Sequence, residues 1–183
     1  MFTYCTKSTR KEALWVVSNI SANSEADAIA VAKHPLLINL LFASRDNSFD
    51  IRKEAIWTLS NILYQVNDKD SIEILVNNDV VGILIERLQR DHDSGSICSL
   101  SLQSVDYLLQ KSANARSIFD RFGGESVVQD LQLSEFHEVY QYAQTILEKH
   151  FGAQEMDEDE KKEFIKNRDA AVVSSKNSTS FVI

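Results

Sequence analysis

The sequence predicts an all-α fold in which helical units repeat along the chain, an α-solenoid. The first observation is composition: 5 Gly and 1 Pro in 183 residues leave few turn signals, which favours helices joined by short connections. The second is a hydrophobic content of 44%, which is enough for one sizeable core. The third is an internal repeat, because residues 10–20 and 52–62 align without a gap and are identical at most positions.

The two strong copies begin at Arg10 and Arg52, 42 residues apart, within the roughly 40 to 47 residues per unit of armadillo and HEAT solenoids. Helical periodicity continues between them and is interrupted at Pro35, so each unit consists of two short helices and a longer third helix. Two weaker copies of the third helix follow. The predicted helices span residues 10–20, 24–33, 36–43, 51–63, 70–77, 80–90, 99–110, 115–122, 125–133 and 139–150.

Three regions are expected along the chain. Residues 1–7 form an N-terminal extension, residues 8–151 form the repeat array, and residues 152–183 form an acidic tail.

The acidic tail has too little apolar surface to offset the entropy of ordering, so most of it is expected to be disordered. Its last residues, Phe181, Val182 and Ile183, are interpreted as an untethered terminus, with a docking role as the less favoured alternative.

The third helix of each strong copy has two distinct faces. At 100° per residue, one arc of the second copy is apolar, and the opposite arc carries Trp57 among polar residues. The first copy repeats this pattern with Trp15. The expected inward residues are Ala13, Leu14, Val17 and Ile20 in the first copy and Ile51, Ala55, Ile56, Leu59, Ile62 and Leu63 in the second.

A Trp on a polar helix face needs an explanation, because this side chain offers much surface to bury. One alternative is that a neighbouring repeat covers it. The other is a binding surface for an extended basic peptide: Asn fixes the peptide backbone, indole faces contact Lys or Arg stems, and Glu pairs with the cationic heads. The residues of this candidate site are Glu12, Trp15, Ser18, Asn19, Glu54, Trp57, Ser60 and Asn61.

Other function classes find little support. A formal charge of −8 argues against nucleic-acid binding. No stretch resembles a signal peptide or a membrane span, and Cys5 and Cys98 are expected to be free thiols. No residue pattern indicates a metal site, a cofactor or catalysis, so we expect a protein that is not an enzyme. Residues 91–95 faintly match a calcium loop but lack its closing Glu, so a solvated loop is expected there.

Two nine-residue segments, KEALWVVSN at 11–19 and KEAIWTLSN at 53–61, closely resemble the third-helix signature of importin-α armadillo repeats. Residues 122–151 are similar to that family's last repeat and are followed, as there, by an acidic stretch. The resemblance covers about residues 8–159 and corresponds to the family's seventh to tenth repeats. It implies a right-handed armadillo-repeat superhelix of about 3.5 repeats.

The resemblance also implies a function. The family's seventh and eighth repeats help to form the minor site for nuclear localisation signals, so the eight residues named above would line that site on the concave face. The chain would then be a nuclear import adaptor, or a fragment of one, found in cytoplasm and nucleus. The last repeat and the acidic stretch, near Tyr140 to Glu160, would contact the export receptor of importin-α.

The sequence also departs from that family. It has no basic segment of the kind that engages importin-β, so binding to importin-β is not expected. In the third copy, Gln103 and Tyr107 replace the Trp and the Asn, so only the first two copies carry the Trp and Asn pair. The first helix has no preceding helices to cover it, which predicts self-association through this N-terminal face or a truncated chain. A general armadillo scaffold for another partner, or a truncated competitor that does not transport cargo, is the alternative function.

Overall fold

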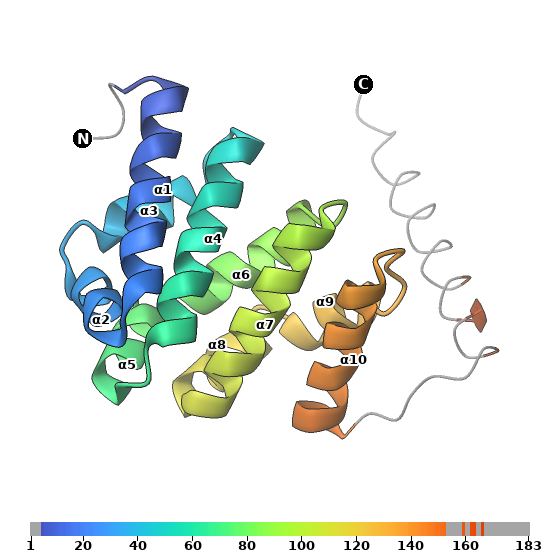
Figure 1. Ribbon diagram of the computed structural model, residues 1–183. Coiled ribbons are helices and arrows are strands. Elements are labelled where there is room, and N and C mark those ends of the chain that lie inside the picture. The colour runs from blue at the N-terminus through green and yellow to red at the C-terminus, as the bar shows by residue number, and fades with distance from the viewer. Residues whose placement is uncertain (1–4, 153–158, 160–161, 164–165, 167–183) are drawn as a thin grey trace, which may run out of the picture.

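The structure is a computed structural model that describes residues 5–152, 159, 162–163 and 166, and the described part contains helices and no strand. The all-α prediction is confirmed. Ten α-helices follow one another along these residues (Figure 1). They are α1 (Lys7–Asn23), α2 (Glu25–Lys33), α3 (Leu37–Ala43), α4 (Phe49–Gln65), α5 (Lys69–Asn77), α6 (Val80–Arg90), α7 (Gly95–Lys111), α8 (Ala113–Arg121), α9 (Gly124–Leu131) and α10 (His137–Phe151).

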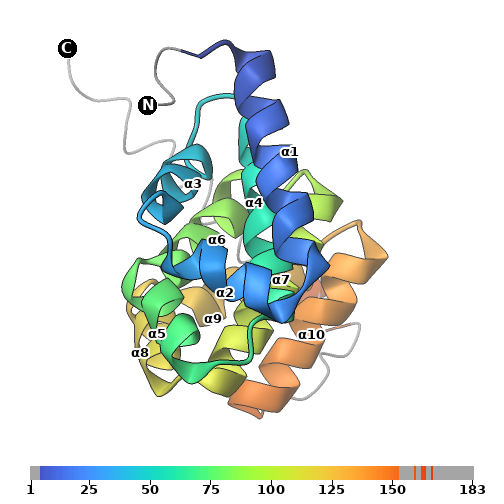
Figure 2. The same ribbon diagram turned by 60° about the vertical axis from the view of Figure 1, so that its left-hand side comes forward.

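The long helices form one layer of an α-solenoid. Helix α1 packs on α4, α4 on α7, and α7 on α10, and the short helix pairs lie on one side of this layer (Figure 2). One long helix is thus followed by three units of two short helices and a long one. We call the surface of α1, α4, α7 and α10 that faces away from the short helices the long-helix face.

Local sequence starts several of these helices. The side chains of Thr6, Ser24, Asp68 and Ser112 each accept a hydrogen bond from a backbone N–H three residues later, which satisfies a donor that the first helical turn leaves unpaired. Helix α7 begins at Gly95, four residues before its predicted start. A Cβ on Gly95 would lie only 2.8 Å from the ring of Phe136, so the close packing of α7 against the start of α10 depends on this glycine.

The core follows the predicted apolar arc of α4. All six inward residues predicted for this helix are at most 1% exposed. Each buried large aliphatic side chain contributes about 1.5 to 3 kcal/mol relative to an exposed one, so this face holds α4 between its neighbours.

The first helix differs from α4 because the described residues place no helix before it. Of its four predicted inward residues only Leu14 is buried, and Ile20 is 46% exposed. Its neighbour Val16 is 48% exposed, whereas Thr58 and Ile62, the equivalents of Val16 and Ile20 in α4, are fully buried. Burial of this side of a long helix therefore depends on the preceding repeat.

Arginine–aspartate pairs join successive units. Arg10 at the start of α1 contacts Asp46 before α4, and Arg52 at the start of α4 contacts Asp91 before α7, with an Nη2–Oδ1 distance of 2.5 Å. Arg87 Nη1 also donates to Asp91, at 3.0 Å. The side chains of Asp91 and Arg87 are 3% and 2% exposed. The prediction of a solvated loop at residues 91–95 is therefore wrong for Asp91, because two arginines hold its carboxylate inside the array.

No single helix in the described part is long and apolar enough to cross a membrane. Helices α2 and α3 meet the length and composition criteria only together, and they are bent by 85°. Ala28, Ala32, Leu37, Leu40 and Leu41 of this pair are buried in the array. Most of the predicted acidic tail, including residues 153–158 and Phe181 to Ile183, lies outside the described residues.

Candidate peptide-binding surface

Helices α1 and α4 carry the eight predicted site residues on two adjacent, aligned helices. Thr58 Oγ1 donates to the carbonyl of Leu14, and Gln65 Nε2 donates to that of Ala22. These bonds join residues about 44 positions apart, so equivalent positions of the two helices lie near one another. The sequence repeat thus becomes a spatial repeat across the long-helix face.

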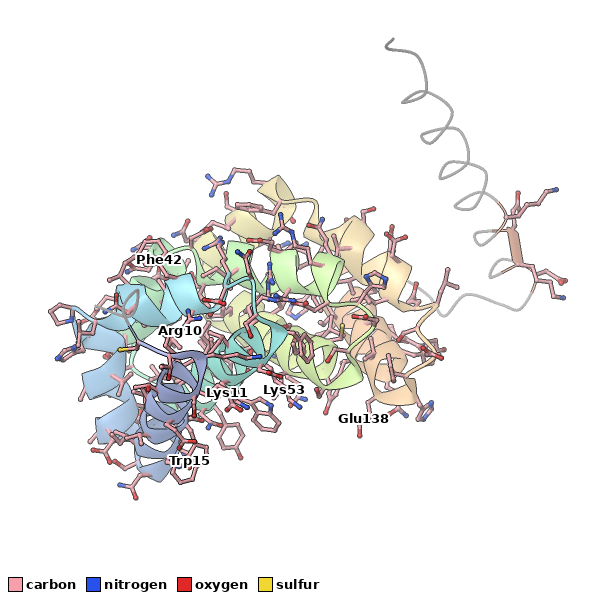
Figure 3. All side chains as sticks on the ribbon, turned by 90° about the horizontal axis from the view of Figure 1, so that it is seen from above. Arg10, Lys11, Trp15, Phe42, Lys53 and Glu138 are labelled. Atoms are coloured by element: carbon pink, nitrogen blue, oxygen red, sulfur yellow. The ribbon has the colours of Figure 1, made fainter. Side chains whose placement is uncertain are left out.

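Both tryptophans are exposed. Trp15 is 57% exposed and Trp57 is 41% exposed, so neighbouring repeats leave part of each side chain accessible. Trp15 and Phe42 lie on opposite sides of the array (Figure 3). Two indole faces on one side of a protein are available for contact with a ligand.

Glu12 and Glu54 accompany the tryptophans. Within the part of the chain that the structure describes, neither carboxylate has an ion-pair or hydrogen-bond partner. Both are therefore free to pair with a ligand cation. Lys11 and Lys53 precede them in sequence and lie near Asp50, whose pKa is lowered mainly by a hydrogen bond from Lys7 and to a smaller extent by these two lysines.

The two asparagines are in different states. The side chain of Asn19 is exposed and makes no hydrogen bond to the described residues. Asn61 Nδ2 instead donates to Ser18 Oγ at 2.9 Å and lies 3.4 Å from the Ser18 carbonyl. Asn61 therefore links α4 to α1, and its carbonyl oxygen is the group left for a ligand.

The two serines lie between helices. Ser18 is 8% exposed and accepts the bond from Asn61, while Ser60 Oγ is 3.0 Å from Ser104 Oγ of α7. Both serines hold neighbouring helices together in this structure. We call the other six residues, Glu12, Trp15, Asn19, Glu54, Trp57 and Asn61, the Trp/Asn ladder, with one rung on α1 and one on α4. Glu54 and Asn61 are half-buried, and the other four are exposed.

The sequence did not predict a hollow next to the second rung. It has a volume of about 410 Å³ and lies between α4, α7 and α10. Ser60 and Asn61 form one edge, and the rings of Tyr64, Tyr107 and Tyr142 line it. We call it the tyrosine hollow. One sequence signal relates to the tyrosine hollow: Gln103 and Tyr107, which line it, occupy the positions in α7 that Trp57 and Asn61 occupy in α4.

The described residues provide no group of three or more His, Cys, Asp or Glu side chains able to hold a metal ion. Burial raises the pKa of the Cys98 thiol to about 12, with smaller effects of Asp91 and Asp93, so this thiol stays protonated at neutral pH. Cys5 and Cys98 are both free, as predicted.

No protein-family model matches the chain, and no curated protein matches it. Solved structures do. A designed armadillo repeat protein in complex with the peptide (KR)4 has a TM-score of 0.71 and 21% identity, over 80% of this chain and 60% of that one. A second designed armadillo repeat protein has a TM-score of 0.69 and 20% identity, with the same coverage of both chains. An engineered protein from a structural genomics programme has a TM-score of 0.71 and 22% identity.

At these identities the likeness concerns the fold. The chain spans about 60% of the length of these first structural neighbours. The chain therefore folds as an armadillo-type α-solenoid.

Proposed function

We propose that this chain is an armadillo-type interaction scaffold that binds an extended Lys/Arg-rich peptide along the Trp/Asn ladder. The observation that carries the proposal is the pair of exposed tryptophans, each beside a carboxylate without a partner among the described residues. An indole face gains roughly 0.5 to 2 kcal/mol from a cation placed over it. The neighbouring carboxylate then neutralises that cation.

The spacing of the ladder suits an extended chain. Packed helices lie about 8 to 10 Å apart and an extended peptide advances about 3.3 Å per residue, so the two rungs meet peptide residues about three positions apart. Asn19 offers both a donor and an acceptor to the peptide backbone. The basic peptide bound by one of the designed armadillo neighbours lends this proposal support.

The more specific proposal is that the natural ligands are nuclear localisation signals and that the chain is an import adaptor or a fragment of one. It rests on the resemblance of residues 11–19 and 53–61 to importin-α. On this proposal the protein moves between cytoplasm and nucleus, and its last repeat contacts an export receptor near Tyr140 to Glu160. Residues 153–158 and 160 of that range lie outside the described residues. A nuclear localisation signal fused to a fluorescent protein, co-expressed with the chain, tests it: capture of the wild-type signal but not of a Lys-to-Ala signal is expected.

We also propose that the N-terminal face packs on a second copy of the chain. Val16 and Ile20 are about half exposed, and their equivalents in α4 are buried against a neighbouring long helix. Sedimentation velocity across a concentration series tests this: the Val16→Ser/Ile20→Ser variant is expected to stay monomeric where the parent associates. A parent that remains monomeric at high concentration contradicts it.

Calorimetric titration of a Lys/Arg-rich octapeptide into the full chain tests the proposed function. Weak, saturable binding is expected, with an affinity that falls as salt rises because exposed charge pairs are screened. The double substitution Trp57→Ala/Asn61→Ala is expected to abolish it, whereas Phe42→Ser, on the opposite side of the array, serves as a control. Unchanged binding by the double variant would show that the ladder is only a packing surface.

A further inference from the structure

The tyrosine hollow continues the Trp/Asn ladder. Asn61 belongs to both surfaces, and Gln103 and Tyr107 stand on α7 where Trp57 and Asn61 stand on α4. A peptide that follows the two rungs from α1 to α4 therefore reaches the hollow as its next contact. The hollow takes the place of a third rung.

The charges of the hollow differ from those of the ladder. Its one carboxylate, Asp106, is fully engaged: His150 Nε2 lies 2.7 Å from Oδ1, Lys149 Nζ lies 3.2 Å from both oxygens, and Gln110 Nε2 donates to Oδ2 at 2.8 Å. No free carboxylate remains among its lining residues. A Lys or Arg side chain entering the hollow would lose hydration without gaining a counter-ion.

The walls of the hollow are aromatic and its floor is apolar. Leu63, Leu102 and Ile146 beneath it are at most 1% exposed, and the exposed rings of Tyr64 and Tyr142 stand at its rim. The Tyr107 hydroxyl donates to the carbonyl of Val66, which fixes that ring in place. A volume of about 410 Å³ lies within the usual range of about 300 to 1,000 Å³ for ligand sites lined mainly by apolar and aromatic groups.

We propose that the tyrosine hollow is a subsite for an uncharged aromatic side chain of the same peptide that the ladder binds. The inference rests on the proposed function and adds a second element to the ligand. Because the next long helix lies about three extended residues away, the aromatic residue stands about three positions from the basic residue at Trp57. The ligand is therefore a basic segment followed or preceded by an aromatic residue, and not a uniformly basic one.

Fluorescence anisotropy with labelled peptides and the full chain tests the subsite. Each peptide carries the same Lys/Arg segment and one test residue, Phe, Ala or Lys, placed three positions beyond the end of that segment. Two versions of each peptide are made, with the test residue on the N-terminal or the C-terminal side, because the direction of binding sets which end reaches the hollow. In one direction, the Phe peptide is expected to bind about tenfold more tightly than the Ala peptide, from ring contacts and apolar burial. The Lys peptide is expected to gain nothing over Ala.

Variants of the chain test whether the higher affinity of the Phe peptide comes from the tyrosine hollow. Tyr64→Ser together with Tyr142→Ser is expected to reduce binding of the Phe peptide to that of the Ala peptide while leaving the Ala peptide unchanged. Both residues are at the exposed rim, with Tyr64 85% and Tyr142 36% exposed, so the fold should tolerate the change. Phe42→Ser removes an aromatic side chain that is 68% exposed on another part of the surface, and it is expected to preserve the preference for Phe.

Each outcome separates the two proposals. Equal binding of the Phe and Ala peptides in both directions, or a Phe advantage that survives in the rim variant, overturns the subsite and leaves the ladder standing. Failure of all peptides to bind overturns the ladder and the subsite together.

Discussion

The position of Trp15 and Trp57 within the helical period of their own helices determines that these side chains are exposed. The helical period puts Ile56 and Leu59 toward the core and Trp57 away from it, and the structure follows this division at these three residues. The same pattern did not reveal what the polar residues between the helices do. Whether Ser18 and Asn61 face a ligand or each other depends on the register of α1 against α4, which a single helix does not encode.

Asn19 and Asn61 form a matched pair for separating binding from stability. Asn61→Ala removes the bond to Ser18 and is expected to lower the free energy of unfolding by about 0.5 to 1.5 kcal/mol, while Asn19→Ala is expected to leave it unchanged. Both are expected to weaken peptide binding. Urea denaturation of the two variants beside the parent gives the comparison, and an equal loss in both would mean that the link between the helices carries no stability.

At the scale of elements, the order of helices was predictable and the contacts between units were not. The period of 42 residues, the break at Pro35 and the apolar arcs located all ten helices to within a few residues. The start of α7 was placed too late because Gly95 and its serine neighbours resemble a loop in sequence. Tertiary packing overrides this local preference for a loop. Phe136 lies against Gly95, and the side chains of Ile97 and Cys98 are buried.

The contact of Arg52 and Arg87 with Asp91 is expected to hold α4, α6 and the start of α7 together. Asp91→Asn removes the charge but keeps the shape, so Arg52 loses the carboxylate that it contacts and the buried Arg87 keeps only Glu86, whose Oε1 lies 2.7 Å from Nη2. A loss of about 3 to 5 kcal/mol in the free energy of unfolding is expected, measured by urea denaturation.

Asp120→Asn is the control for that variant. Asp120 pairs with Arg116 at 3.4 Å on the surface, where the side chains are 56% and 38% exposed. Its loss is expected to cost less than about 1 kcal/mol because solvent screens such a pair. Similar losses in both variants would contradict the structural role assigned to Asp91.

At the scale of the whole molecule, the array has two unlike ends. The N-terminal end exposes Val16, Ile20 and Phe42, while the outer side of α10 carries exposed polar residues such as Glu138, Gln141 and Glu148. Between these ends the long-helix face changes from two Trp rungs to the tyrosine hollow. The sequence predicted where the ladder stops, but the hollow required three helices to be placed together and so emerged only from the fold.

The two tryptophans of the chain both belong to the ladder, so intrinsic fluorescence reports on this surface alone. Titration of a Lys/Arg-rich octapeptide that contains no aromatic residue is expected to change the tryptophan emission until the site is saturated. The affinity from this titration is expected to equal the affinity measured by calorimetry, and the change in emission is expected to disappear at high salt. Calorimetric binding without a change in emission would place the peptide elsewhere and contradict the account.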